Sequence, residues 1–214
     1  MDQPTNQNAR RWRSPNRAAW DFYPTPPEAT KALLSVEDFS DGSVWEPACG
    51  DGAIAKVLED AGLTVAATDL INRGYGQAGF DFLTGTGVMG KHIITNPPYG
   101  RGLADAFVRQ ALTYTRATGG KVAMLLDLRS LCHPLRHDRW AKTPPAVVYA
   151  LDELTCYPNG DTSKAGYKPG RQRFVWCVWK HDHQGPTQLR WLAATQFKEA
   201  APAQDEPQQA EAAA

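Results

Sequence analysis

Hydrophobic positions follow two different spacings along the middle of the chain. Short apolar or alternating runs predict strands at 43–48, 64–68, 91–95, 121–126, 146–151 and 171–180. Apolar residues at helical spacing predict helices at 29–36, 54–61 and 103–114, the last two stopped by Gly62 and by Gly119-Gly120. Strands that alternate with helices in this way indicate a doubly wound α/β sheet.

Two of the predicted strands have the pattern of central strands. The run from Lys121 to Leu126 is almost continuously apolar, and the run from Arg171 to Lys180 alternates with apolar residues on both faces. At the other end of the chain, Thr25 and Glu28 stand three residues apart with Pro26 between them. This spacing predicts a capping box in which Thr25 begins the first helix.

The ends of the chain lack this periodicity. Residues 1–19 are polar and contain four arginines, which predicts a mobile basic arm, and residues 193–214 are rich in Ala, Gln, Pro and Glu, which predicts a disordered tail. Between them, residues 20–192 are long enough for one sizeable core, in a chain of 214 residues of which 42% are hydrophobic. We therefore expect one domain with two tails.

Charge, cysteine content and hydropathy limit the binding partners, metal sites and cellular locations that are expected. The formal net charge is zero, so any nucleic-acid binding must come from local basic patches. The four cysteines show no Cys-x-x-Cys spacing, which predicts reduced thiols and no metal site. No apolar run is long enough to span a membrane, and no secretion signal opens the chain, so a cytoplasmic protein is expected.

A pair of prolines ends the predicted strand at 91–95. Pro97 and Pro98 cannot donate to a sheet, so Asn96 is a strand-end residue, and its backbone is held extended. A carboxamide, stiff backbone carbonyls and the ring of Tyr99 then reach the carboxyl edge of the sheet, where α/β proteins bind ligands. These groups match an exocyclic amino group on a flat ring. The alternative for the tetrapeptide alone is an ordinary Asn-Pro turn.

A second group of residues has the order of a nucleoside pocket. Two glycines of Glu46-Pro47-Ala48-Cys49-Gly50-Asp51-Gly52 lie in a strand-to-helix turn, and Asp69 ends the next strand, where a carboxylate can accept both hydroxyls of a ribose. Asp81-Phe82 adds a carboxylate and a ring for an adenine. Taken singly, Asp69 also fits a turn and Phe82 also fits a core. No third glycine completes a dinucleotide fingerprint, so one nucleoside is expected.

Together these motifs resemble the class I S-adenosylmethionine-dependent methyltransferases that form N6-methyladenine in DNA. The matching pieces lie between about residues 20 and 130 and have the gamma order of small phage and prophage members: Phe22-Tyr23-Pro24-Thr25-Pro26, Glu46 to Gly52, Asp69, Asp81-Phe82-Leu83, and Asn96-Pro97-Pro98-Tyr99. The resemblance implies a Rossmann-like methyltransferase fold, with a mostly parallel seven-stranded sheet and an antiparallel C-terminal strand. It also implies S-adenosylmethionine as cofactor and duplex DNA with a flipped adenine as substrate.

The resemblance assigns roles residue by residue. The catalytic residues would be Asn96, Pro97, Pro98 and Tyr99, with the Asn96 oxygen and the Pro97 carbonyl polarising the amino group and Tyr99 stacking on the base. The cofactor would be bound by Tyr23, Pro24, Thr25, Glu46, Ala48, Cys49, Gly50, Asp69, Asp81 and Phe82.

The chain has no separate target-recognition domain. Substrate contacts are therefore expected from segments 129–142 and 152–170, with candidate residues Arg129, Arg136, Arg139, Lys168 and Arg171. A solvated basic surface is the alternative for both segments.

Two other functions fit parts of the pattern. One is a methyltransferase that acts on a protein glutamine or on the amino group of an RNA base. The other is a non-catalytic protein that binds S-adenosylmethionine or nucleic acid, against which the intact Asn96, Asp69 and Asp81 argue. Neither the target sequence nor the oligomeric state is encoded in a recognisable motif.

Overall fold

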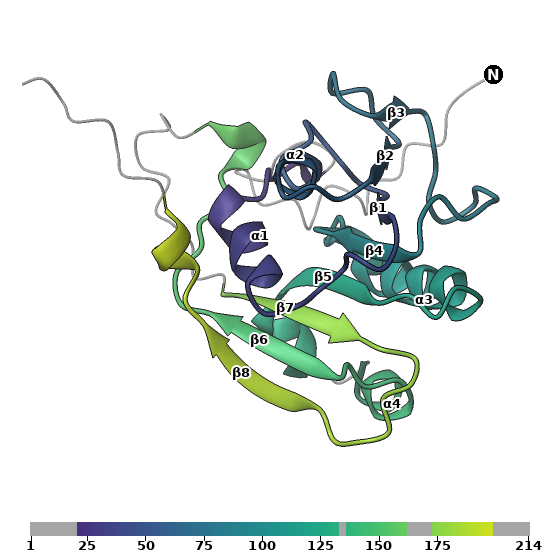
Figure 1. Ribbon diagram of the computed structural model, residues 1–214, viewed down its shortest axis with the longest axis vertical. Coiled ribbons are helices and arrows are strands. Elements are labelled where there is room, and N and C mark those ends of the chain that lie inside the picture. The colour runs from purple at the N-terminus through teal and green to yellow at the C-terminus, as the bar shows by residue number, and fades with distance from the viewer. Residues whose placement is uncertain (1–20, 133–135, 162–172, 199–214) are drawn as a thin grey trace, which may run out of the picture.

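A mixed sheet of eight strands runs through the centre of the described residues (Figure 1). The computed structural model describes residues 21–132, 136–161 and 173–198. The strands are β1 (Val44–Glu46), β2 (Val65–Asp69), β3 (Gln77–Ala78), β4 (His92–Thr95), β5 (Val122–Asp127), β6 (Val147–Leu151), β7 (Phe174–Trp179) and β8 (Gln188–Leu192). Their spatial order is β3-β2-β1-β4-β5-β7-β6-β8.

Strand directions confirm the expected fold class. Pairings from β3 to β5 are all parallel, and β7 lies antiparallel between β5 and β6. All six residues of β7 are buried, as its apolar pattern on both faces predicts. The sheet has eight strands where seven are expected, because β8 adds to the edge of β6 in parallel although four of its five residues are exposed. Backbone pairing rather than burial forms this strand, so hydrophobic spacing does not reveal it.

Helices cover both faces of the sheet. One face is covered by α1 (Pro27–Leu34), α2 (Ala55–Asp60) and the 3₁₀ turn η7 (Ala194–Phe197), and the other by α3 (Leu103–Arg116) and α4 (His137–Lys142). Shorter 3₁₀ turns are η3 (Gly100–Gly102), η4 (Leu128–Cys132) and η6 (Pro158–Gly160). Alternate residues of β5 enter the two cores, with Leu125 on one side and Met124 on the other. The doubly wound arrangement is confirmed.

The predicted capping box is wrong. Pro26 holds the N-cap position of α1 with an extended backbone (φ −56°, ψ 138°), Pro27 follows as the first helical residue, and no side chain caps the helix. Two consecutive prolines thus move the helix start one residue away from Thr25, whose hydroxyl makes a different contact described below. The helix also ends at Leu34 rather than Val36.

The C-terminal boundary also needs correction. Residues 193–198, which the sequence assigns to the tail, include η7, and Ala194 is fully buried against the core. The Ala194 N–H donates to Asp152 Oδ1 at 2.8 Å, so backbone hydrogen bonding holds a segment of low hydrophobicity. The predicted N-terminal arm and residues 199–214 lie outside the described residues.

A buried glutamate ties α1 to the amino-terminal edge of the sheet. Glu37 accepts hydrogen bonds from Lys121 Nζ and Lys180 Nζ, both at 3.0 Å, and from the Tyr149 hydroxyl at 2.9 Å. Burial alone would raise the pKa of this carboxyl, but the bonds from Lys121, Lys180 and Tyr149 outweigh it, and the pKa lies below 4.5. The carboxylate is therefore part of the folded structure as an anion.

Glu37→Gln should lower the free energy of unfolding at neutral pH by about 1–3 kcal/mol, because hydrogen bonds to a charged group weaken when one partner becomes neutral. A group whose pKa is lowered on folding stabilises above its unfolded pKa, so the difference should be full above about pH 5 and shrink as the pH falls. Urea unfolding of both proteins across this range measures it. Asp60→Asn, at an exposed carboxylate on α2, should change stability by less than about 0.5 kcal/mol. A difference that grows towards acid pH would contradict this account.

Candidate active site

The strand order reverses between β1 and β4, at the middle of the sheet. The chain proceeds from β1 towards β2 and β3 on one side, and from β4 towards β5 on the other. Loops that leave the carboxyl ends of two such strands diverge, and ligands bind in the crevice between them. The glycine loop follows β1 and Asn96 follows β4, so the fold brings the two predicted halves of the site to this point.

Asn96 is held by two neighbours from the N-terminal segment and by one from its own loop. Its Nδ2 donates to Thr25 Oγ1 at 3.0 Å and to the Tyr23 carbonyl at 3.3 Å, and its Oδ1 accepts from the Tyr99 hydroxyl at 2.5 Å. The N-terminal segment and the Asn-Pro-Pro-Tyr loop, more than 70 residues apart in sequence, therefore form one unit. The Gly100 N–H donates to Asp21 Oδ2 at 2.7 Å and joins the same two segments again.

The Tyr99 ring forms part of the wall beside Asn96. Its hydroxyl also lies 2.9 Å from the Leu125 carbonyl of β5, and its ring centre is 6.5 Å from that of Phe174. Burial raises the pKa of Tyr99 well above 10.0, so the hydroxyl stays protonated and donates. Pro97 is buried and Pro98 half-buried. Stacking of Tyr99 on a base stays a prediction.

The loop after β1 depends on its glycines. Gly50 and Gly52 have φ values of +58° and +85°, which favour glycine. A Cβ atom would lie 2.8 Å from the Phe22 ring at Gly50 and 2.6 Å from the Tyr75 ring at Gly52. The backbone of this loop is therefore packed closely between two aromatic side chains.

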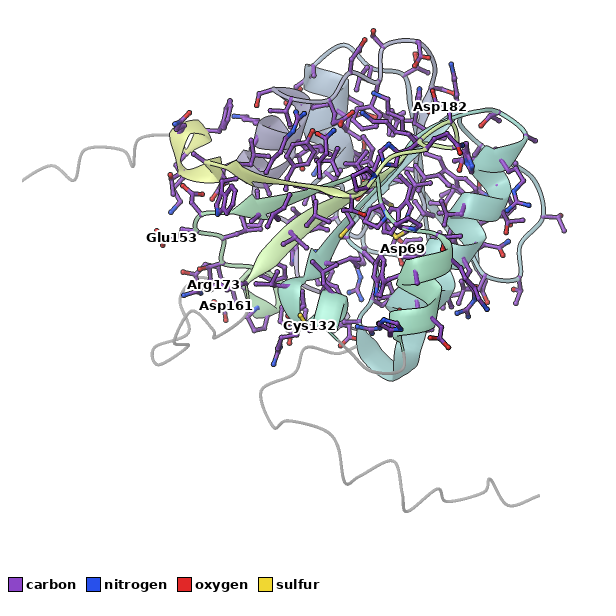
Figure 2. All side chains as sticks on the ribbon, turned by 90° about the horizontal axis from the view of Figure 1, so that it is seen from below. Asp69, Cys132, Glu153, Asp161, Arg173 and Asp182 are labelled. Atoms are coloured by element: carbon purple, nitrogen blue, oxygen red, sulfur yellow. The ribbon has the colours of Figure 1, made fainter. Side chains whose placement is uncertain are left out.

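Asp69 joins this loop to the end of β2 (Figure 2). Its Oδ2 accepts from the Gly50 N–H at 2.8 Å and its Oδ1 from the Ile71 N–H at 2.7 Å. A carboxylate oxygen can accept more than one hydrogen bond, so both oxygens keep capacity for a ligand hydroxyl. The predicted ribose contact is compatible with this geometry.

Glu46 is a buried carboxyl at the base of the glycine loop. Only 2% of the residue is exposed, and Oε2 has no hydrogen-bond partner among the described residues. Burial raises the pKa of Glu46 well above 4.5, and nearby Asp69 and Asp51 raise it further. The neighbouring Cys49 thiol is buried as well, with a pKa raised to about 12, so that residue offers a ligand its backbone rather than its sulfur. Ala48 beside it is half-buried.

Phe82 packs in the hydrophobic core, and its predicted contact with adenine stays a prediction. Its ring is 2% exposed and lies 4.8 Å from Phe107, 5.1 Å from Trp45 and 5.4 Å from Tyr114 between ring centres. The core reading of this residue, which the sequence left open, is the one that the packing supports. Asp81 beside it is half-buried and accepts the Leu83 N–H at 2.9 Å through Oδ1.

Phe82→Leu tests whether Phe82 contributes to the core alone or also contacts the cofactor. We expect it to lower the free energy of unfolding by about 1–2 kcal/mol, because part of a packed ring is lost where complete truncation costs about 3–5 kcal/mol. Its affinity for S-adenosylmethionine, measured by calorimetry, should stay within about twofold of the wild type. A large loss of affinity without loss of stability would restore the predicted contact with adenine.

The predicted substrate residues differ in their exposure and in their ion pairs. Arg129 is 73% exposed but makes a two-pronged ion pair with Asp127 at the end of β5, its Nη2 lying 2.5 Å from Oδ2. Arg136 is 17% exposed and pairs with Asp105 of α3 at 2.8 Å, so it fastens its segment to that helix. Arg139 lies in α4, and its side chain is outside the described set, as are Lys168 and Arg171 altogether.

Both predicted recognition segments leave the sheet at the edge where Asn96 lies. The first begins in η4, directly after β5, and the second begins directly after β6. In the second, the Asn159 N–H donates to the Phe22 carbonyl at 3.0 Å, next to Tyr23. Asp161 and Arg173, which bracket residues 162–172, are labelled in Figure 2. The described starts of both segments thus lie at the edge of the sheet where the crevice lies.

Sequence reasoning did not recognise the loop between β2 and β3 as part of the site. Tyr75 covers Gly52, and the Arg73 guanidinium lies 4.0 Å from the centre of the Phe22 ring. The only sequence signal was the pair of glycines that flank Tyr75, Gly74 and Gly76, both with positive φ. This loop and the N-terminal segment enclose the glycine loop from two sides.

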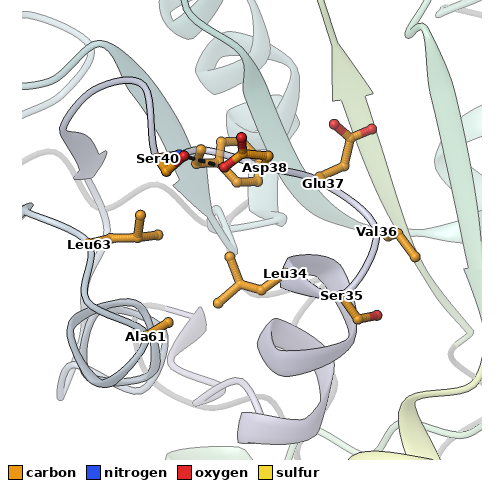
Figure 3. Close-up of a pocket in the computed structure, with 9 residues that line it drawn as sticks. Leu34, Ser35, Val36, Glu37, Asp38, Ser40, Ala61 and Leu63 are labelled. Atoms are coloured by element: carbon orange, nitrogen blue, oxygen red, sulfur yellow. Dashed lines mark hydrogen bonds between the residues drawn. The ribbon is translucent and has the colours of Figure 1, made fainter.

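A separate pocket opens at the opposite edge of the sheet (Figure 3). Its volume is about 440 Å³, and it is lined by residues that precede β1 and β2: Leu34, Ser35, Val36, Glu37, Asp38, Phe39, Ser40, Ala61 and Leu63. It is therefore distinct from the crevice at Asn96. The described residues contain no cluster of three potential metal ligands and no helix with the length and apolar character needed to cross a membrane.

No protein-family model and no curated protein sequence matches the chain. Solved structures do match. A Listeria monocytogenes protein assigned to the class I S-adenosylmethionine-dependent methyltransferases matches with a TM-score of 0.54 at 15% identity, over 79% of this chain and 65% of that one. The chain has the class I methyltransferase fold.

Two further structures share this methyltransferase fold. One is a protein from Pyrococcus horikoshii assigned as an RNA methyltransferase, with a TM-score of 0.54 and 14% identity over 75% of this chain and 85% of that one. The other is the methyltransferase subunit of a type I restriction-modification system from Streptococcus thermophilus, with a TM-score of 0.52 and 13% identity over 82% of this chain and 47% of that one. The chain thus spans less than two thirds of the Listeria protein and under half of the Streptococcus subunit.

Proposed function

We propose that this protein transfers the methyl group of S-adenosylmethionine to the N6 amino group of adenine in DNA. One observation carries the proposal: the Asn96 carboxamide, oriented by three hydrogen bonds, lies after β4 at the switch point, beside the glycine loop that follows β1. A methyl donor bound at the end of β1 and a substrate amino group bound at the end of β4 would meet at this crevice.

The residues after β1 and β2 fit the cofactor. The close-packed turn at Gly50 and Gly52 suits its methionine part, Asp69 can accept the ribose hydroxyls, and the unpartnered buried oxygen of Glu46 lacks a donor that an ammonium or hydroxyl could supply. Leu70, which follows Asp69, is 52% exposed and offers an apolar surface for the adenine in place of Phe82. When bound, S-adenosylmethionine supplies an electrophilic methyl group on a positively charged sulfur.

The chain's own role is to make the adenine amino group a better nucleophile. Its nitrogen lone pair is delocalised into the ring until both N–H bonds turn out of plane. Asn96 Oδ1 and the Pro97 carbonyl can each accept a hydrogen bond from one of these N–H groups and stabilise the positive charge that grows on nitrogen. As the nitrogen–methyl bond forms, the sulfur–methyl bond would break to leave a neutral thioether, and the nitrogen would then lose one proton to solvent. Hydrogen bonds to a charged group are worth about 1.5–3 kcal/mol each, so this would supply one to three decades of rate if made mainly in the transition state.

DNA is the proposed substrate for two reasons. The exposed Arg129 lies at the end of β5, where a phosphate could compete for the guanidinium. Methylation subunits of type I restriction systems are among the proteins that share the fold. A target in duplex DNA would have to leave the stack before it could reach Asn96.

The proposal is tested by incubating the protein with methyl-labelled S-adenosylmethionine and duplex DNA, digesting the DNA to nucleosides and separating them. We expect the label in N6-methyl-2′-deoxyadenosine. Parallel reactions should contain single-stranded DNA, RNA and a mixture of proteins. Label that appears only in RNA or protein would overturn the choice of DNA, and label in no substrate together with no binding of the cofactor would overturn the methyltransferase function.

A further inference from the structure

The orientation of the Asn96 amide is decided by the N-terminal segment. The two ends of a carboxamide have the same shape but opposite hydrogen-bonding character, since oxygen accepts and NH₂ donates. The Tyr23 carbonyl, 3.3 Å from Asn96, can only accept. The NH₂ group must therefore face Tyr23, and Oδ1 must face the opposite way, towards Tyr99.

Thr25 supports the same orientation from a buried position. The residue is 4% exposed, and its hydroxyl oxygen accepts from Asn96 Nδ2 at 3.0 Å. Because Thr25 does not cap α1, its hydroxyl makes no hydrogen bond to the first turn of that helix. On the other side, the single proton of the Tyr99 hydroxyl faces two acceptors, Asn96 Oδ1 at 2.5 Å and the Leu125 carbonyl at 2.9 Å, and the shorter contact is with Oδ1.

This orientation matters because only one end of the amide, the oxygen, can accept a hydrogen bond from an amino group. Turned by 180°, Asn96 would present NH₂ to the adenine amino group, and two donors would face each other. Side-chain rotation would also be free if the NH₂ group had no partners. Preorganised acceptors are effective because no rearrangement is needed as charge develops.

We propose that Thr25 is a positioning residue that, with the Tyr23 carbonyl, holds the Asn96 amide with its oxygen towards the substrate. This inference rests on the proposed methyl transfer, and it replaces the predicted contact between Thr25 and the cofactor. The group that binds to Asn96 Oδ1 is thus an exocyclic amino group of the substrate. The orientation of Oδ1 is set by a segment more than 70 residues away in sequence.

Thr25→Val tests the inference, because valine keeps the shape of threonine and removes the hydroxyl. We expect kcat to fall about five- to tenfold, with the Kd for S-adenosylmethionine and the KM for DNA within about twofold of the wild type. Thr25→Ser should restore most of the rate. Thr30→Val is the matched control, since the Thr30 hydroxyl is buried without a partner among the described residues, and it should leave kcat unchanged.

A second measurement does not depend on activity. In protein labelled with ¹⁵N-asparagine, the side-chain NH₂ signals of Asn96, assigned by their loss in Asn96→Ala, should shift in Thr25→Val and stay in place in Thr30→Val. Unmoved signals, or an unchanged kcat in Thr25→Val, would overturn the positioning role. A weaker Kd for S-adenosylmethionine with unchanged kcat would instead assign Thr25 to the cofactor. Shifted NH₂ signals in a protein that methylates no substrate would overturn the proposed function alone.

Discussion

Replacing Asn96 by alanine should lower kcat for methyl transfer by about a hundred- to a thousandfold. The change removes the acceptor that faces the amino group, and loss of one preorganised group of this kind costs about that much in other enzymes. It also leaves the Tyr99 hydroxyl without the oxygen to which it donates at 2.5 Å. Single-turnover transfer of labelled methyl to DNA measures the rate of the chemical step.

Cofactor binding serves as the control for Asn96→Ala. Among the described residues, the hydrogen bonds of Asn96 go to Tyr23, Thr25 and Tyr99 and not to the glycine loop, so the Kd for S-adenosylmethionine should change by less than about threefold. A rate within about threefold of the wild type would show that Asn96 does not polarise the amino group. Equal losses of rate and cofactor affinity would point to a structural role instead.

Asp69→Ala should raise the Kd for S-adenosylmethionine about a hundredfold. The carboxylate is proposed to accept two ribose hydroxyls, and it also holds the Gly50 and Ile71 N–H groups at 2.8 and 2.7 Å. Charge-assisted bonds worth about 1.5–3 kcal/mol each make this loss plausible in size, since about 1.4 kcal/mol corresponds to a factor of ten. Isothermal titration calorimetry measures the affinity directly.

Two variants sharpen this experiment. Asp69→Asn keeps one acceptor oxygen and should lose less affinity than Asp69→Ala, whereas Asp60→Asn, on the exposed side of α2, should lose none. Circular dichroism at the titration temperature establishes that each variant is folded. An unchanged Kd in folded Asp69→Ala would remove Asp69 from the cofactor site.

Local chemistry was enough to predict most of the regular elements and the position of the crevice. Buried strands such as β5 and β7 are short, mostly apolar runs of the kind typical of central strands, and two prolines end β4. Glycine at positions 50 and 52 follows from the backbone angles that the turn requires. These features depend on residues close together in the chain, so they can be read from it.

Side-chain contacts were harder to predict, because they depend on partners that are distant in sequence. Thr25 has the spacing of a helix cap, yet the two prolines after it leave its hydroxyl to Asn96. Phe82 has the position of a base contact, yet Trp45, Phe107 and Tyr114 enclose it. Arg136 lies in a basic segment that predicts contacts with phosphate, yet its guanidinium pairs with Asp105.

The Asn-Pro-Pro-Tyr segment shows most clearly what the sequence determines and what the tertiary structure determines. Its residues alone determined that a strand ends with a carboxamide at the carboxyl edge of a sheet, because proline cannot continue the ladder. Only the tertiary structure decided which end of that carboxamide faces the crevice, since the choice comes from the Tyr23 carbonyl and the Thr25 hydroxyl. An amide is symmetric in shape, and only its hydrogen-bond partners distinguish its two ends.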